Sequence, residues 1–213
     1  MLRVGLTQRV EIHSERKEHR DCLDQAWAPL LIAQNLVPIP LPNQGADPGI
    51  LLRELKLDGV ILTGGNDLGS VAGGSEAAPE RDLFEEKLLR ACGERGVPVL
   101  GVCRGLQMMV VHHGGTVRRI PQHAATTHPL TLHAPEIMPL RKGMIVNSFH
   151  QFGIRPQDLG PNLKLIATAP DGSVEAAAHR TLRQWGVMWH PERQPSGEEA
   201  AALLRALFTP LVP

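Results

Sequence analysis

Residues 97–111 read VPVLGVCRGLQMMVV, and this stretch decides the fold. It begins with an apolar run typical of a strand buried on both faces of a parallel sheet, and a helical pattern follows. Between them, Gly101-Val102-Cys103-Arg104-Gly105 has the pattern of a nucleophile elbow. Glycines suit the sharp turn because the strained backbone leaves no room for neighbouring Cβ atoms. The segment predicts an open α/β sheet with Cys103 at the carboxyl end of a central strand, where such sheets bind ligands.

The predicted position of Cys103 favours a reactive thiol. The amide dipole of the following helix favours negative charge at its N-terminus, and so favours the thiolate. Backbone amides of the same turn can bind the oxyanion that forms during acyl transfer. The turn alone is also compatible with a cysteine that only packs at a strand–helix junction, so a nucleophile needs a base within reach.

A base is predicted at the end of another buried strand. Residues 185–193 read WGVMWHPER, an apolar strand that ends at His190. His190 can act as the general base and Glu192 can hold its ring, while Pro191 stiffens the spacing between them. A His-Pro-Glu sequence that closes a buried strand, in a chain with a cysteine elbow, favours a catalytic triad.

A third buried strand runs into the sequence LTGGND at residues 62–67. Gly64 and Gly65 permit backbone amides to point at a ligand, which would make this turn a second source of oxyanion donors. A plain strand-to-loop turn is the alternative interpretation.

Strand and helix patterns alternate over residues 1–115, and short strands follow. This order predicts an α/β fold with a mostly parallel central sheet, helices on both faces and a small antiparallel part, in one domain over residues 1–213. Strands are expected at residues 2–7, 36–41, 59–63, 97–102, 144–148, 163–168, 173–178 and 184–189. Helices are expected at residues 18–35, 50–56, 82–93, 106–113 and 197–208.

Two details of these helices are predicted from spacing. Ser196 and Glu199 form a capping box at the start of the last helix. In the helix at residues 82–93, the residues expected to face the core are Leu83, Phe84, Leu88 and Ala91.

Composition excludes several classes of protein. Lys plus Arg and Asp plus Glu number 22 each, so the chain lacks the basic field of a nucleic-acid binder. No apolar run reaches the roughly 18 residues of a membrane span, and the charged N-terminus is unlike a signal peptide. We therefore expect a cytoplasmic protein with no membrane partner, whose cysteines stay reduced. Cys22 and Cys92 are expected to pack on helix faces.

No metal site and no cofactor are predicted. The ten histidines include His123, His128 and His133, but their spacing fits no common zinc signature and no cysteine lies near them. The glycine-rich stretch at residues 64–74 lacks the Lys-Ser/Thr ending of a nucleotide-binding P-loop.

Four motifs in colinear order, LTGGND, GVCRGLQ, NSFHQ and GVMWHPE, resemble the class I glutamine amidotransferases. The branch they resemble is the stand-alone γ-glutamyl hydrolases, which include the γ-glutamyl-γ-aminobutyrate hydrolases. The resemblance covers nearly the whole chain, is shared by the segment RDLFEEKLL at residues 81–89, and implies a flavodoxin-like fold. The N-terminal segments GLTQRVE, ERKEHRDCLDQAW and PIPLPN are similar to the γ-glutamyl-CDP-amidate hydrolases of polysaccharide phosphoramidate synthesis.

The resemblance implies a role for each matching residue. Cys103, His190 and Glu192 would form the catalytic triad. The backbone amides of Gly65 and Arg104 would bind the oxyanion. The residues implied to contact the substrate are Gly64, Gln107, Asn147, Ser148 and His150.

The implied reaction is hydrolysis of a γ-glutamyl amide through a γ-glutamyl thioester, which releases glutamate from a small-molecule substrate without a cofactor. The expected substrate is γ-glutamyl-CDP-amidate, with Arg9, Arg16 and Arg20 as the residues that would meet its phosphates. Three alternatives stay open: a γ-glutamyl-γ-aminobutyrate-type hydrolase, a glutaminase subunit that supplies ammonia to a separate synthetase, and a binder without activity. A homodimer is compatible with each of them.

Overall fold

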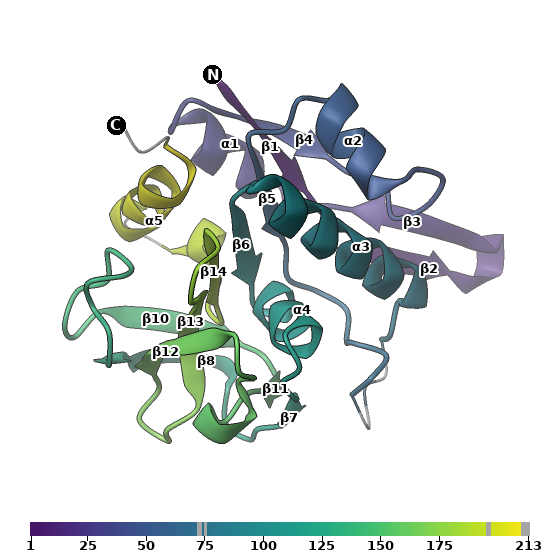
Figure 1. Cartoon of the computed structure of the whole chain (residues 1–213). Helices are drawn as coiled ribbons and strands as arrows, with labels where there is room; N and C mark the ends of the chain where they lie inside the picture. The colour runs from purple at the N-terminus through teal and green to yellow at the C-terminus, as the bar shows by residue number, and fades with distance from the viewer. Residues whose placement is uncertain (72–73, 75, 195–196, 210–213) are drawn as a thin grey trace.

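The computed structural model describes residues 1–71, 74, 76–194 and 197–209 (Figure 1). Its largest sheet has eight strands in the order β4-β1-β5-β6-β14-β13-β12-β9. The strands from β4 to β14 pair in parallel, and β13, β12 and β9 extend the sheet in antiparallel fashion. The mostly parallel sheet with an antiparallel extension, predicted from the order of the sequence patterns, is confirmed.

The parallel strands are short and largely buried. In spatial order they are β4 Leu36–Pro40, β1 Leu2–Leu6, β5 Gly59–Leu62, β6 Val99–Val102 and β14 Gln184–Val187. Every residue of β5 and β6 is buried, as expected for continuous apolar runs covered on both faces. β4 contains two prolines and lies at the edge of the sheet, where a missing amide donor breaks no bond to a further strand.

The remaining strands belong to the second half of the chain and to one N-terminal hairpin. The antiparallel strands of the large sheet are β13 Val174–His179, β12 Leu163–Thr168 and β9 Thr131–Leu132. Three two-stranded sheets pair β10 Ile145–Phe149 with β8 Ala124–Pro129, β11 Phe152–Gly153 with β7 Arg118–Arg119, and β2 Arg9–His13 with β3 Glu18–Cys22.

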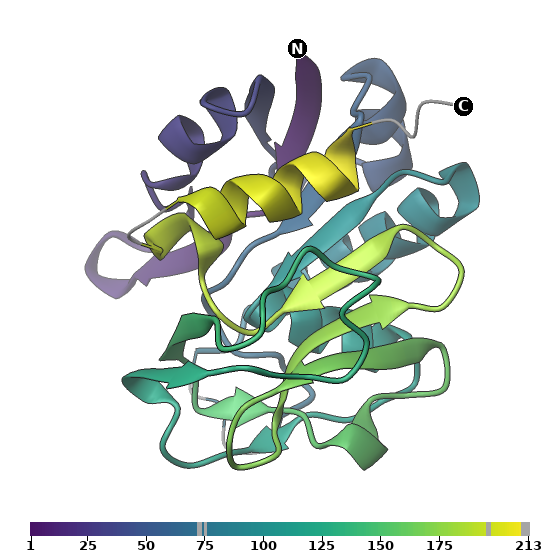
Figure 2. The same cartoon turned by 90° about the vertical axis from the view of Figure 1, so that its left-hand side faces the viewer.

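Helices cover both faces of the large sheet (Figure 2). On one face, α1 Trp27–Ile32 and α5 Glu198–Phe208 share a core cluster with strand residues. On the other face, a second cluster is formed with α2 Pro48–Glu54, α3 Pro79–Arg95 and α4 Arg104–His112. The central strands are therefore sealed from water except at their ends, and chemistry is confined to those ends.

Local signals set several helix ends. Asp47 caps α2 by accepting a backbone amide, and Pro48 fills the first helical position. α3 ends at Gly96, which adopts the left-handed conformation with a φ of 67°. The N-cap of α5 is Gly197, while Ser196 of the predicted capping box lies outside the described residues.

The helix predicted over residues 18–35 is wrong for its first half. Residues 18–22 form β3, which pairs with β2 in a hairpin, and only Trp27–Ile32 is helical. The segment Glu18–Cys22 is polar and largely exposed, so it offers no apolar face that could hold a helix against the sheet. Cys22 consequently lies on a strand rather than on a helix face.

The helix predicted over residues 82–93 extends to Pro79–Arg95, with one error in its buried face. Phe84 and Leu88 are buried as expected, whereas Leu83 is 53% exposed. Arg81 and Glu85 are fully buried in its place because they form ion pairs inside the protein. Within the described residues, no helix combines the length and apolar character needed to cross a membrane.

The glycine at position 105 tests the close packing of α4 on β5. A Cβ atom on Gly105 would lie 2.1 Å from the carbonyl oxygen of Leu62, which is backbone and cannot rotate away. We expect Gly105→Ala to lower the free energy of unfolding by about 3 kcal/mol. Gly93→Ala is the matched control, because its Cβ would meet only a side chain at 3.6 Å, and it should stabilise α3 by about 0.5 kcal/mol. Urea unfolding measures both, and equal stability of the two variants would contradict this packing.

Candidate active site

Cys103 sits at the sharp turn between β6 and α4. Its backbone has φ 53° and ψ −106°, a strained conformation for a residue with a side chain, and its amide donates to Val187 O at 2.8 Å. Gly101 and Gly105 flank this turn, and a Cβ on Gly101 would lie 2.7 Å from backbone atoms of Gly105. The structure therefore has the elbow geometry that the sequence predicted, with the thiol at the N-terminus of a helix.

His190 lies beside Cys103 because β14 is the parallel neighbour of β6. The register pairs Val187 with Val102, so the residues that follow each strand leave the sheet at the same edge. His190 makes a side-chain hydrogen bond with Cys103, and its Nδ1 lies 2.7 Å from Glu192 Oε1. The geometry thus brings the three predicted triad residues into one chain of contacts.

These contacts change the protonation of His190. Burial alone would lower its pKa, but the hydrogen bonds with Cys103 and Glu192 and the charges of both outweigh burial and raise the pKa to about 9. The imidazolium is therefore the favoured form near neutral pH, next to the sulfur. Because the folded pKa exceeds the ordinary value, the stability that His190 contributes is complete below about pH 6.5 and is lost as the pH rises through 9.

Asn147 holds the backbone of His190 rather than facing the pocket. Asn147 Oδ1 accepts the amide of His190 at 2.8 Å, and Asn147 Nδ2 donates to the carbonyl of His190 at 2.9 Å. Both polar atoms of this buried side chain are used in that pair of bonds. The geometry supports a positioning role for Asn147 in place of the direct substrate contact expected from the sequence.

A buried arginine orients the turn that follows β5. Arg81 donates to the carbonyls of Thr63 at 2.6 Å, Gly64 at 3.2 Å and Gly65 at 2.6 Å. In a trans peptide the N–H points away from the preceding carbonyl, so these bonds direct the amides of Gly64 and Gly65 away from Arg81. Gly65 also lines the pocket at Cys103, which supports its amide as an oxyanion donor.

The same arginine belongs to an ion cluster that sequence reasoning missed. Arg81 Nε lies 2.9 Å from Glu85 Oε1, and Arg104 pairs with Glu85 and Asp82. Burial alone would raise the pKa of Glu85, but Arg104 and Arg81 outweigh it and lower that pKa. Charged residues on a helix usually face water, so little in the sequence indicates this buried cluster. The one available signal is the segment RDLFE at residues 81–85.

The triad opens into a polar pocket of about 310 Å³. Gln107 and His150 line it, as predicted, and Gln107 is held by a bond from its Nε2 to Phe152 O at 2.9 Å. Arg104 lines it as well. Ser148 lies apart from this lining, because it is fully buried and its hydroxyl donates to the carbonyl of His123 at 2.8 Å.

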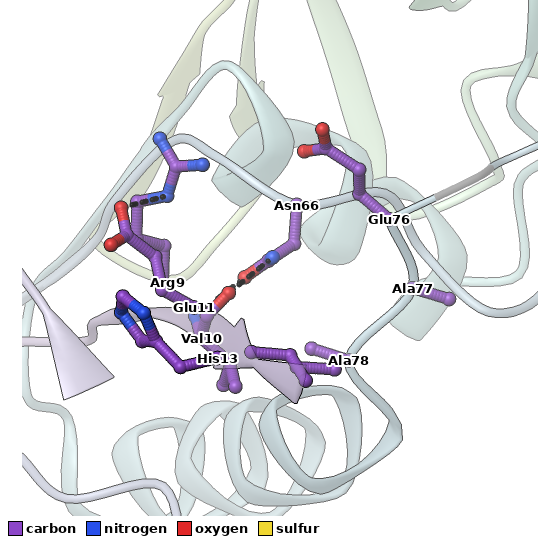
Figure 3. Close-up of a pocket in the computed structure, with 9 residues that line it drawn as sticks. Arg9, Val10, Glu11, His13, Asn66, Glu76, Ala77 and Ala78 are labelled. Carbon is purple, nitrogen blue, oxygen red and sulfur yellow. Dashed lines mark hydrogen bonds and ion pairs between the residues drawn. The ribbon is translucent and has the colours of Figure 1, made fainter. Parts of the chain in front are cut away.

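Arg9 is the arginine of the N-terminal hairpin that reaches the pocket. It packs over Gly65, and it lines both the triad pocket and an adjoining pocket of about 420 Å³ (Figure 3). Asn66 fixes this arrangement by exchanging two hydrogen bonds with the backbone of Val10, at 2.8 and 2.9 Å.

The other two arginines expected at the phosphates lie elsewhere. Arg16 belongs to the exposed tip of the hairpin, and Arg20 is paired with Glu18 on β3. Arg193, which sequence reasoning did not single out, lines the triad pocket, and its guanidinium lies 5.6 Å from the centre of the Phe149 ring. The hairpin register explains the change. Arg20 pairs with Glu11 and shares the face of Arg9, but it lies two residue pairs nearer the tip and away from the pocket.

Comparison with protein families agrees with this geometry. The family model described as peptidase C26 matches residues 4–192. The chain belongs to the peptidase C26 family. Its relatives include a γ-glutamyl-CDP-amidate hydrolase of Campylobacter jejuni, 32% identical with 97% of each chain covered. A γ-glutamyl-γ-aminobutyrate hydrolase of Escherichia coli O157:H7 is also 32% identical, with 87% of this chain and 83% of the relative covered.

The fold is that of the class I glutamine amidotransferases. A glutamine amidotransferase from Thermotoga maritima superimposes with a TM-score of 0.73, covering 98% of this chain and 99% of the other. Its sequence identity is 16%, so this likeness speaks for the fold alone. The peptidase C26 match and the γ-glutamyl hydrolases among its relatives identify the chain as a hydrolase with this fold.

Alkylation tests whether Cys103 is the reactive thiol. Burial raises the pKa of Cys92 to about 12, and burial together with Glu11 raises the pKa of Cys22. At pH 7, iodoacetamide should therefore modify Cys103 first, and His190→Ala should slow that reaction about tenfold because it removes the cationic partner. Mass spectrometry of digests at short times locates the adduct. Earlier labelling of Cys22 or Cys92 would contradict the assignment.

The titration of His190 tests its contact with Glu192. Glu192→Gln removes a negative charge that raises the pKa of His190, so that pKa should fall below about 9 toward its ordinary value. NMR of histidine-labelled protein follows the imidazole through the titration. Glu198→Gln, at the exposed start of α5, is the control and should leave the titration unchanged. A pKa near 9 in both variants would show that Glu192 does not act on His190.

Proposed function

We propose that this chain hydrolyses a γ-glutamyl amide, with Cys103 as nucleophile, His190 as general acid and base, and Glu192 as the residue that orients His190. The observation that carries this proposal is the contact chain from Cys103 through His190 to Glu192, at the mouth of a polar pocket lined by Gln107. The γ-glutamyl hydrolases among its relatives support the same substrate class.

The first half of the proposed reaction forms a thioester. The Cys103 thiolate attacks the γ-carbonyl carbon, and the carbonyl oxygen becomes an oxyanion held by the amides of Gly65 and Arg104. Each such donor is worth about 3–4 kcal/mol in comparable acyl transfers. The C–N bond then breaks as the His190 imidazolium protonates the departing nitrogen, which leaves a γ-glutamyl thioester and a neutral imidazole.

The second half releases glutamate. The neutral imidazole of His190 removes a proton from water, whose oxygen attacks the thioester carbon. The C–S bond breaks, the thiolate of Cys103 returns, and the imidazolium beside Glu192 is restored. Both halves use protein groups alone, so the proposal includes no cofactor.

The specific substrate we propose is γ-glutamyl-CDP-amidate, which would place the enzyme in capsule polysaccharide biosynthesis. Support comes from a relative of that name covered over 97% of both chains. It also comes from Arg9, which lines both the triad pocket and the adjoining 420 Å³ pocket, the second of which is drawn in Figure 3. A guanidinium in that position can bind a phosphate of the leaving group while the glutamyl group occupies the triad pocket.

A γ-glutamyl-γ-aminobutyrate hydrolase is the second candidate, favoured by relatives with that name. A glutaminase subunit would need a separate synthetase chain. The three candidates differ in the leaving group: a phosphorylated one, a carboxylate-bearing amine, or ammonia. The glutamyl half of the substrate is common to all three candidates. The residues around Arg9, which would contact the leaving group, therefore determine which substrate is preferred.

Steady-state kinetics on the isolated chain separates these candidates. We expect kcat/KM for γ-glutamyl-CDP-amidate to exceed that for γ-glutamyl-γ-aminobutyrate and for glutamine, because remote contacts to a large leaving group lower the barrier at the scissile bond. Arg9→Ala should reduce kcat/KM for the phosphorylated substrate by about tenfold to a hundredfold and leave glutamine hydrolysis nearly unchanged.

Two control variants accompany this experiment. Arg20→Ala removes an arginine of the same hairpin that lines neither of the two pockets, so it should behave as the wild type. Cys103→Ala should hydrolyse none of the substrates, which ties the turnover to this site. Preference for γ-glutamyl-γ-aminobutyrate, with Arg9→Ala like the wild type, would reject the phosphorylated substrate. Turnover in Cys103→Ala would reject the proposed mechanism itself.

A further inference from the structure

Three histidines and one glutamate meet between the small β8–β10 sheet and the large sheet. His123 and His128 come from the start and the end of the β8 segment, His150 follows β10, and Glu175 lies on β13. Glu175 Oε1 lies 3.7 Å from His123 Nδ1, 3.5 Å from His128 Nε2 and 3.6 Å from His150 Nε2. His123, His128 and Glu175 each offer one potential ligand atom, and these three atoms lie within 4.8 Å of one another.

Glu175 is buried without a hydrogen bond from the described residues. Its side chain is fully buried, and neither of its carboxylate oxygens has a hydrogen-bond partner among the described residues. The facing Nε2 atoms of His128 and His150 have no hydrogen-bond partner in this part of the chain either. A buried carboxylate and two buried ring nitrogens in this condition are costly, unless a cation lies between them.

The far sides of the His123 and His128 rings contact polar groups in the way that metal-binding histidines are held. His123 Nε2 lies 3.3 Å from Ser173 Oγ and 3.5 Å from Asp171 Oδ2, and the Ser173 hydroxyl donates to Asp171. His128 Nδ1 lies 3.4 Å from the carbonyl of Pro129. Carboxylates and carbonyls in these places fix the tautomer and direct the other nitrogen at a metal.

The hydrogen bonds around His123 also indicate which of its ring nitrogens would bind a cation. The hydroxyl of Ser148, 3.3 Å from His123 Nδ1, already donates its proton to the carbonyl of His123. If Nε2 carries the ring proton toward Ser173, then Nδ1, Ser148 Oγ and Glu175 Oε1 all present lone pairs to one point. Such an arrangement attracts a cation.

We propose that His123, His128 and Glu175 bind one zinc ion. Two imidazoles and a carboxylate are a ligand set that zinc prefers, with bonds of about 2.0–2.2 Å. In a tetrahedron of that size the ligand atoms lie about 3.3–3.6 Å apart. The distances of 3.5 and 3.7 Å from Glu175 Oε1 to the two histidines need only a small adjustment to reach it.

The site is separate from the triad but next to its pocket. His150, whose Nε2 also faces Glu175, lines the triad pocket, while Asn147 on the same segment holds the backbone of His190. A zinc ion would therefore join β8 to β13 and fix the segment that supports the base. Its role here is structural, because Cys103 and His190 complete the proposed chemistry without it.

Metal binding by the full-length chain is the test. Protein stripped with a chelator is titrated with Zn²⁺ alone, and bound metal is measured by plasma mass spectrometry after gel filtration. We expect one zinc per chain and a rise in melting temperature on its addition. His128→Ala and Glu175→Gln should each weaken zinc binding at least about tenfold. His133→Ala is the control, because that histidine is exposed and its Nε2 lies 3.0 Å from Thr168 Oγ1 outside the cluster, and the variant should bind zinc like the wild type.

A second measurement covers the case in which a variant fails to fold. Wild-type protein loaded with Co²⁺ should show the intense visible bands of a four-coordinate site, and Zn²⁺ should abolish them. Absence of zinc binding in the wild type, or equal binding in Glu175→Gln and His133→Ala, would overturn the proposal and leave a buried network of histidines and glutamate. Because the readout is metal content, it stands apart from any failure of the hydrolase assay.

Discussion

The arrangement of the active site depends on one buried carboxylate, that of Glu85, held between Arg81 and Arg104. Removing this carboxylate would leave the buried guanidinium of Arg81 without its ion-pair partner, which is far more costly than the pair is stabilising. Arg81 also binds the carbonyls of the turn that contains Gly65, and Arg104 directly follows Cys103. The cluster therefore fixes the two amides that would hold the oxyanion relative to one another, and such donors act only when they are placed in advance.

Sheet geometry supplies the second requirement, a base beside the nucleophile. The parallel pairing of β6 with β14 brings Cys103 and His190 together at one edge although they are far apart in the sequence. The strained turn at Cys103 lifts its side chain out of the sheet, and the bonds from Asn147 fix the backbone from which the imidazole extends. The packing and hydrogen bonds around Cys103 thus stabilise its strained backbone conformation.

The sequence predicts this central part well because buried apolar runs and glycine-flanked turns are local signals. It predicts the supporting parts poorly, since their polar residues look like surface residues until the fold closes over them. From the sequence alone, Arg81 and Glu85 resemble solvated charges on a helix, and Asn147 resembles a ligand contact. The groups that hold them, at Gly65, Arg104 and His190, come from distant segments. The apolar period around Trp27 was extended too far back, into residues 18–22, where pairing with β2 decides the structure.

Two buried glutamates flank the site, and they differ in how their charge is balanced. Glu85 faces two guanidiniums, which are charged at every physiological pH, and its pKa is lowered despite burial. Glu175 faces imidazoles, and burial raises its pKa to about 7. The α3–α4 side of the site therefore has a permanent positive charge opposite its carboxylate, whereas the β8–β13 side lacks one. A divalent cation held by Glu175 and its histidines would give the second side the same fixed charge balance that Arg81 and Arg104 give the first.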